Sequence, residues 1–156
     1  MTELTERGPS DPDDLILMVA VVLAIILGLC VAFSSKAWGA EIPEETAVKC
    51  LLGEARGEGY TSLLYHAEAL RNRGTINGVY GCKARLTEEW PYLQAKGLVG
   101  QARQAWRESE TTDFTHGATY WGSLLVDGKW IAKMEKSGYV QTAKIKNTVF
   151  YKAGAK

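Results

Sequence analysis

The sequence has few of the residues that most often bind transition metals or serve as activated nucleophiles. It contains two histidines and three cysteines in 156 residues, with no CxxC pair and no closely spaced histidines. Zinc sites depend on such spacings, so we expect neither a metal site nor another cofactor. The serines and cysteines also lack the glycine-flanked elbow or dyad context of a nucleophilic hydrolase.

Neither sign of charge is in excess, because 18 basic residues balance 18 acidic ones. The charge is unevenly spread, however: residues 1–40 carry two basic residues against five acidic ones, and seven lysines follow Gly128 against the single Glu135. A basic C-terminal surface suits an anionic partner such as a cell wall or phospholipid, although a merely solvated lysine face has the same pattern. Basic and aromatic residues do not alternate as in nucleic-acid modules, so we expect no nucleic-acid partner.

One long hydrophobic run is present, LILMVAVVLAIILGLCVAF at residues 15–33. As a helix it reaches roughly 28 Å, close to the hydrocarbon thickness of a bilayer. We predict a single-pass transmembrane helix held in the lipid bilayer, preceded by a disordered acidic tail at 1–14 and followed by a linker at 34–43. The domain at 44–156 then lies outside the cytoplasm. The alternative is an export signal cut near Ala40, with secretion of the domain.

Helical patterns come first in this domain. Pro43 and the two acids after it suit the first turn of a helix. Apolar residues at 47, 48, 51, 52 and 55 form a helical stripe, which Gly57 and Gly59 end. Thr61 or Ser62 can cap a second helix.

A third helix is predicted over 98–106, and the pattern then changes. The segments ATYW, KWIAKM and TVFYK are rich in β-prone residues and separated by glycine, aspartate and lysine. We predict two or three short antiparallel strands there. The fold class is therefore α+β, with helices followed by a small sheet.

The stretch LLGEARGE places Glu54 at the margin of the apolar stripe, where the first helix ends. A carboxyl group at such a margin is partly desolvated, which disfavours its charged form and raises its pKa. A general acid that protonates a leaving oxygen near neutral pH needs this property. Glu54 is therefore the candidate acid, although a glutamate at a glycine-bounded helix end is more often a solvated surface charge.

Two polar residues near Glu54 are candidates for supporting roles. Glu58 can act as a partner carboxylate, pair with Arg56 or cap the next helix, and we favour a structural role for it. Asn72 lies between two arginines. It either terminates the second helix or is a buried hydrogen-bonding residue that supports the site, and we favour the second interpretation.

Aromatic residues gather in the segment DFTHGATYWGS at 113–123. The flat faces and polar tips of Tyr120 and Trp121 suit sugar rings. Because neighbouring side chains on a strand point to opposite sides, we expect one of the two to belong to the core. Tyr139 presents the same choice between a substrate contact and the core.

Cys50 and Cys82 fall within the predicted domain. If the domain is exported, they can form a disulfide that closes a loop of about 32 residues and stabilises the fold by roughly 3–4 kcal/mol on the chain-entropy model. Two free, buried thiols are the alternative.

The order of these motifs resembles that of the cell-wall hydrolase family of the spore-cortex-lytic (SleB/CwlJ) type. The matching segments lie between about residues 46 and 152, and they are LLGEARGEGYTSLLYHAEALRNR, ARQAW, DFTHGATYW and IKNTVFYK. The resemblance implies a lysozyme-like catalytic domain related to lytic transglycosylases, with Glu54 as its catalytic glutamate. It also implies that Thr115 and Tyr120 line the substrate cleft. The neighbouring candidate contact, His116, stands where the family often has a small or amide residue.

By this resemblance the protein would bind peptidoglycan glycan strands and cleave the bond between N-acetylmuramic acid and N-acetylglucosamine as a lytic transglycosylase. Glu54 would act first as acid and then as base, and the muramic acid 6-hydroxyl would close on C1, so that no second carboxylate is needed. Simple muramidase hydrolysis is the alternative if Glu58 orders a water. Another alternative is a membrane-anchored peptidoglycan-binding structural component of a virion or a secretion apparatus, with little or no catalysis.

Overall fold

The structure is a computed structural model that describes residue 22 and residues 42–154. The predicted acidic tail, the apolar run apart from Val22, and the linker up to residue 41 lie outside the described residues. The chain divides into two compact units, Met1–Trp38 and Gly39–Lys156. Among the described residues, no helix combines the length and the apolar composition needed to cross a bilayer.

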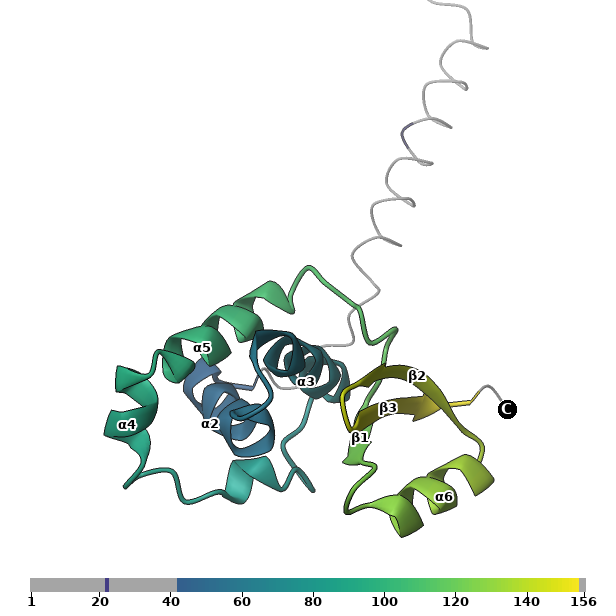
Figure 1. Cartoon of the computed structure of the whole chain (residues 1–156). Coiled ribbons are helices and arrows are strands. Elements are labelled where there is room, and N and C mark those ends of the chain that lie inside the picture. Colours follow the sequence, from purple (N-terminus) through teal and green to yellow (C-terminus); the bar gives the residue numbers. More distant parts are fainter. Residues whose placement is uncertain (1–21, 23–41, 155–156) are drawn as a thin grey trace, which may run out of the picture. The chain divides into compact units, whose positions relative to one another are not determined.

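The first part of the second unit is helical (Figure 1). Its elements are α2 (Glu44–Ala55), α3 (Tyr60–Arg73), the 3-10 helix η1 (Gly81–Lys83), α4 (Trp90–Ala95) and α5 (Leu98–Glu108). The two acidic residues in the first turn of α2 interact favourably with the helix dipole, as the sequence predicted. The short helix α4 occupies a segment for which the sequence made no prediction.

Helix α3 begins earlier than predicted. Its first residue is Tyr60, and the preceding Gly59 has φ 87°, a conformation that favours glycine. Neither Thr61 nor Ser62 is the cap. Ser62 lies inside the first turns of the helix, fully buried, and its hydroxyl donates to Glu58 Oε2 at 2.7 Å.

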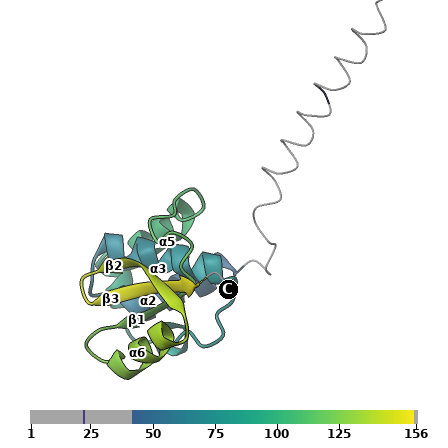
Figure 2. The same ribbon diagram turned by 90° about the vertical axis from the view of Figure 1, so that its right-hand side faces the viewer.

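The C-terminal part contains a three-stranded antiparallel sheet of β1 (Tyr120–Ser123), β2 (Tyr139–Ile145) and β3 (Thr148–Ala153). The strand order is β1-β3-β2, so β3 is central and β1 lies at an edge. Tyr120 pairs with Tyr151 across β1 and β3. Figure 2, seen from the sheet side, shows these strands in front of α2 and α3. The predicted α+β class is confirmed.

The segment KWIAKM is a helix, and its prediction as a strand is wrong. It forms most of α6 (Gly128–Lys136), between β1 and β2. Trp130, Ile131 and Met134 have the i, i+1, i+4 spacing of one helical face, and they pack against Val149 and Tyr151 of the sheet. This tertiary contact outweighs the local β propensity of a tryptophan–isoleucine pair.

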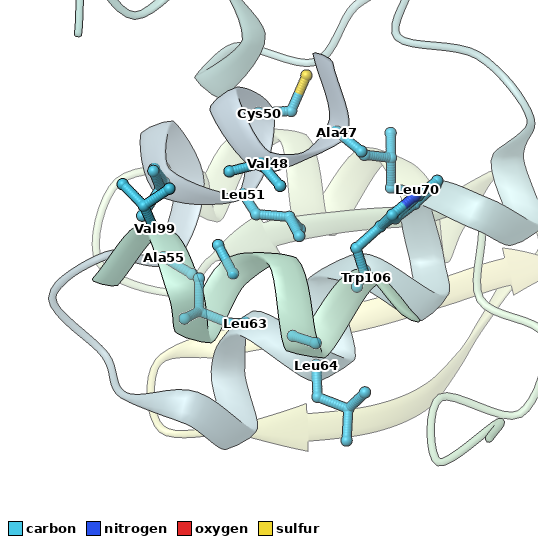
Figure 3. Packing of buried hydrophobic residues seen from close by; sticks show 14 of the residues in the cluster. Ala47, Val48, Cys50, Leu51, Ala55, Leu63, Leu64, Leu70, Val99 and Trp106 are labelled. Atoms are coloured by element: carbon cyan, nitrogen blue, oxygen red, sulfur yellow. The ribbon is translucent and has the colours of Figure 1, made fainter. Parts of the chain in front are cut away.

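The apolar faces of α2, α3 and α5 pack into one core (Figure 3). Val48, Leu51, Leu63, Leu70 and Trp106 each keep at most 5% of their surface exposed. Burial of a side chain of this size contributes about 1.5–3 kcal/mol. This core fixes the direction of α2, and therefore the place where Glu54 leaves it.

The sheet is attached to the helical part through the central strand. Phe150 of β3 is fully buried and packs with Ala69 of α3 and with Ala118. The rings of Tyr65 and His66, both on α3, meet the Phe150 ring edge-on at 5.9 and 5.2 Å between centroids. The strands therefore take a defined position against α3.

Cys50 of α2 and Cys82 of η1 are joined by a disulfide. Of the two alternatives for these cysteines, the structure has the bonded one. The two residues lie 32 positions apart, so the bond fastens the loop after α3 to the side of α2.

Candidate active site

A cleft of about 720 Å³ lies where the end of α2, one face of α3, and β1 meet. Its walls include Glu54 from α2, His66 and Arg73 from α3, Trp121 from β1 and Trp130 from α6. This volume falls in the range of small-molecule and substrate sites. We call this space the cleft.

The carboxyl group of Glu54 is held by two hydrogen bonds. The main-chain N–H of Gly81 donates to Oε1 at 2.5 Å, and the indole Nε1–H of Trp121 donates to Oε2 at 3.1 Å. Each oxygen of a carboxylate has two lone pairs, so both oxygens keep acceptor capacity after these bonds. The two donors fix the plane of a half-buried carboxyl group that lines the cleft.

Gly81 reaches Glu54 because two glycines allow η1 to approach α2 closely. A Cβ on Gly81 would lie 2.5 Å from Cγ of Glu54 and 2.6 Å from the Cys50 carbonyl oxygen. A Cβ on Gly53 would lie 2.1 Å from the Gly81 carbonyl oxygen. Real Cβ atoms do not approach other heavy atoms this closely, so a side chain at either position would push η1 away from the acid.

Glu58, Ser62 and His66 form a hydrogen-bonded row beside Glu54. Ser62 donates to Glu58, and Nδ1 of His66 lies 2.7 Å from the Ser62 carbonyl oxygen. A carbonyl only accepts, so Nδ1 carries the proton and Nε2 is left as an acceptor in the neutral ring. Burial lowers the pKa of His66, and the nearby carboxyl groups of Glu54 and Glu58 oppose this effect only in part.

Aromatic rings form much of the cleft wall. Trp121 packs edge-on to His66, with centroids 5.6 Å apart, and Tyr120 packs edge-on to Tyr139 at 5.3 Å. The expectation that one of Tyr120 and Trp121 belongs to the core is met only in part. Trp121 packs against the core of α2, α3 and α5, but both residues are half-buried and both line the cleft. They point to opposite sides of a short edge strand, and each side reaches the cleft.

Four predicted contacts do not line the cleft. Asn72 is exposed, because it is one position from Arg73 on α3 and so points about 100° away from it. Thr115 is fully buried, and its N–H donates to Glu68 Oε2 at 2.9 Å. His116 is exposed at a turn with φ 51°. Tyr139 lies behind Tyr120 rather than in the cleft wall.

The sequence interpretation missed several residues that the fold brings to the cleft. His66, Arg73 and Asp127 line the cleft and Gly81 donates to Glu54, but none of the four was a candidate. Asp127 lines the cleft, and its Oδ2 accepts from the Ser123 N–H at 2.8 Å. A signal for Gly81 was available: Cys50 lies one helical turn before Glu54, so a bond to Cys82 brings residue 81 to the acid. No cluster of three or more potential metal-ligating side chains occurs in the described part of the chain.

Two solved structures similar to this chain are catalytic domains of SleB. One, from Bacillus cereus, is 20% identical, and the match covers 76% of this chain and 100% of that chain with a TM-score of 0.49. The other, described as a germination-specific lytic transglycosylase from Bacillus anthracis, is 22% identical, with 76% and 98% covered and a TM-score of 0.49. No family model and no curated protein sequence matches the chain. Both structures are of the SleB type that the order of the sequence motifs resembles.

Proposed function

We propose that this protein cleaves peptidoglycan at the glycosidic bond between N-acetylmuramic acid and N-acetylglucosamine, with Glu54 as the general acid. The observation that carries the proposal is the setting of Glu54. Its carboxyl group lines an aromatic-walled cleft, and N–H donors hold both of its oxygens. The motif order described above supports peptidoglycan as the substrate.

The proposed first step breaks the bond between C1 of the muramic acid and the bridging oxygen. Glu54 donates its proton to that oxygen as the bond breaks, and an oxocarbenium-like transition state forms at C1. Glu54 becomes a carboxylate in this step. The N–H groups of Gly81 and Trp121 then stabilise the negative charge that develops on its oxygens, without any rearrangement.

In the proposed second step, the Glu54 carboxylate takes the proton of the muramic acid 6-hydroxyl while O6 bonds to C1. The product is a 1,6-anhydro sugar, and Glu54 is protonated again. The reaction needs one catalytic carboxyl group, which fits a cleft in which Glu54 alone is held by two N–H donors among the described residues.

Muramidase hydrolysis is a second candidate, which the position of Glu58 favours. Glu58 lines the same cleft, and the Ser62 hydroxyl orients its carboxyl group at 2.7 Å. A carboxylate fixed in this way can order a water for attack on C1. The product then has a reducing end instead of an anhydro ring.

A peptidoglycan zymogram of the full-length protein and its Glu54→Gln variant tests the proposal. We expect clearing by the wild type and none by the variant, because glutamine cannot donate the proton. The matched control is Glu88→Gln, an exposed glutamate outside the cleft that should clear normally. Equal clearing by all three proteins would remove Glu54 from the reaction. Binding without clearing by any of them would favour a structural peptidoglycan-binding component.

Mass spectrometry of the released muropeptides separates the two reactions. Anhydro-muramic ends are expected for the lytic route. Reducing ends alone would sink that route and leave the muramidase reaction.

We further propose that the domain works outside the cytoplasm, as a membrane-anchored protein or after export. The Cys50–Cys82 disulfide supports this location, because disulfides persist in oxidising compartments and are rare in the cytosol. N-terminal sequencing of the mature protein would show whether residues 15–33 remain attached.

A further inference from the structure

Arg73 lines the cleft near the C-terminal end of α3. Its Nη2 donates to the Asn77 carbonyl at 2.6 Å, and its Nη1 donates to the Thr119 carbonyl at 3.4 Å. The guanidinium carbon also lies 4.8 Å from the centre of the Tyr120 ring. Among the described residues, no carboxylate oxygen lies within 4.0 Å of this guanidinium.

Arg56 and Arg107, two other arginines of the helical part, are paired with carboxylates. Arg56 bonds Glu89 at 3.1 Å, and Arg107 bonds Glu44 at 2.9 Å. Both of these pairs lie outside the cleft. Arg73 therefore differs from them both in its place and in its partners.

The guanidinium of Arg73 is held in place, but its charge is not balanced locally. Two neutral carbonyls and one ring face fix its orientation, while its Nε is buried and has no hydrogen-bond partner within the described part of the chain. A half-buried cation with no counter-charge nearby attracts an anion. The planar fork of a guanidinium fits a carboxylate with two parallel hydrogen bonds. A pre-positioned fork of this kind binds an anion at little entropic cost.

We propose that Arg73 binds a carboxylate carried by the glycan, so that the cleft selects acidic over neutral glycan strands. This inference rests on the proposed function, since it assigns a subsite of the same cleft. The Arg73 guanidinium and the Glu54 carboxyl group line one space. A carboxylate bound to Arg73 therefore helps to position the sugar whose glycosidic bond Glu54 cleaves.

Two parts of peptidoglycan can supply this carboxylate. One is the lactyl group of muramic acid, which has a free carboxylate where the peptide stem is absent. The other is the peptide stem itself, which has its own carboxylates. The chemistry at Arg73 is the same for both, and the choice of substrate distinguishes them.

The test measures kcat and KM of the full-length protein and its Arg73→Gln variant on three substrates. These are intact peptidoglycan, glycan strands from which an amidase has removed the peptides, and the same stripped strands with their carboxylates converted to neutral amides. We expect Arg73→Gln to lower kcat/KM about tenfold or more on a carboxylate-bearing substrate, mainly through KM. On the amidated strands it should have little effect. The wild type should lose a similar factor when the carboxylates are amidated.

Two further variants keep the test decisive. Arg85→Gln removes an exposed arginine outside the cleft and should leave all three rates unchanged. Arg73→Lys keeps the charge without the fork, and it should give an intermediate loss confined to the carboxylate-bearing substrates, even if the glutamine variant folds poorly. An effect limited to stripped strands identifies the lactyl carboxylate, and one limited to intact peptidoglycan identifies the stem.

Equal losses on neutral and acidic strands would overturn the carboxylate subsite while leaving the proposed reaction intact. If the wild type cleaves none of the substrates, calorimetric titration with stripped and amidated strands still decides the matter. Tighter binding of the acidic strands by the wild type than by Arg73→Gln supports the subsite, and equal binding overturns it.

Discussion

The carboxyl group of Glu54 has donors that come from distant parts of the chain. Gly81 lies 27 positions after it and Trp121 lies 67 positions after it. Neither residue type is an obvious catalytic candidate in a sequence. Gly81 donates through its backbone, and Trp121 is mostly an apolar ring. The two bonds nevertheless decide how the acid faces the cleft.

Replacing Trp121 by phenylalanine should test the indole donor. The ring face is kept, but the N–H that donates to Glu54 Oε2 is lost. Loss of one donor to a developing charge commonly lowers kcat by 100-fold or more, and we expect about 10- to 100-fold here because Gly81 still donates. Steady-state kinetics on peptidoglycan is the measurement. A raised KM with unchanged kcat would instead make Trp121 a substrate contact only.

His66 predicts a pH dependence of stability. Burial lowers the pKa of His66 below the ordinary value of 6.5. The ring therefore becomes protonated at a higher pH in the unfolded chain than in the folded protein. Stability should therefore fall as the pH drops below about 6.5, by at most about 1.4 kcal/mol per pH unit, until the folded pKa is reached. Thermal unfolding between about pH 7.5 and pH 5.5 measures this slope.

The second histidine of the chain is a natural control for that experiment. We expect His66→Gln to flatten the slope and His116→Gln, at an exposed position, to leave it unchanged. If both variants keep the wild-type slope, another group is responsible for the pH dependence.

Single residues were predicted with uneven success, for a physical reason. Glu54, which lines the cleft, could be chosen as a candidate because its position in a local helical pattern and the surrounding motif both point to it. Asn72 was chosen over its neighbour Arg73, although the two point about 100° apart on α3 and only Arg73 lines the cleft. Which of two adjacent polar residues faces a cleft depends on how the helix packs, and that is not a local property.

At the scale of elements, the disulfide links η1 to the acid. Cys82 follows Gly81 directly, so the bond to Cys50 keeps the Gly81 N–H against Glu54. Reduction should lower the stability by roughly 3–4 kcal/mol. It should also lower the activity of the molecules that remain folded, because η1 can then move away from α2. Chemical unfolding and wall-clearing rates, each with and without a thiol reductant, measure the two effects.

A control separates the lost donor from the lost stability. Leu93→Ala on α4 removes a buried side chain that is not part of the cleft wall and should cost about 2–5 kcal/mol. At a temperature where it is still folded, it should keep its activity. A double Cys50→Ala, Cys82→Ala variant should be insensitive to the reductant. Full activity of the folded, reduced protein would show that η1 stays in place without the bond.

A helix was predicted correctly where its own residues carry the pattern, and wrongly where contacts with distant segments decide the structure. The three long helices have their own apolar stripes, and α2 and α5 begin where predicted. Helix α6 was mistaken for a strand because its apolar face is short and gains its burial only from the sheet. The start of α3 was misplaced because Ser62 bonds Glu58 within a buried row instead of capping the helix.

At the scale of the whole molecule, charge predicts how activity responds to salt. Exposed lysines of the C-terminal part are Lys129, Lys133, Lys136, Lys144, Lys146 and Lys152. They should attract an anionic wall over distances near the Debye length, which shrinks from about 10 Å at 0.1 M salt to about 3 Å at 1 M. We expect the rate on intact walls to fall severalfold over this range. The rate on short, neutral glycan fragments should change little.

Reversing two of these charges checks the cause. The variant with Lys133→Glu and Lys136→Glu should be slower on intact walls at low salt and less sensitive to added salt, while its rate on short fragments stays the same. A salt effect that is equal for walls and fragments would place its origin in the cleft.

The α+β class was predictable because the order of helical and β-prone segments follows directly from the residue pattern. The cleft was not predictable, because it forms between α3 and a strand whose position depends on Phe150 packing against Ala69, two residues far apart in the chain. The sequence therefore singled out Glu54, Glu58 and Tyr120, which line the cleft, but not the packing that shapes it.

The central strand of the sheet, β3, is the last of the described helices and strands along the chain. β3 ends at Ala153 and lies between β2 and β1, the strand that presents the indole to Glu54. During translation Glu54 is synthesised about a hundred residues before β3, because α2 and β3 lie near opposite ends of the described domain. A chain that stops before β3 therefore contains Glu54, Gly81 and Trp121 but lacks the strand that pairs with β1 and holds the indole in place.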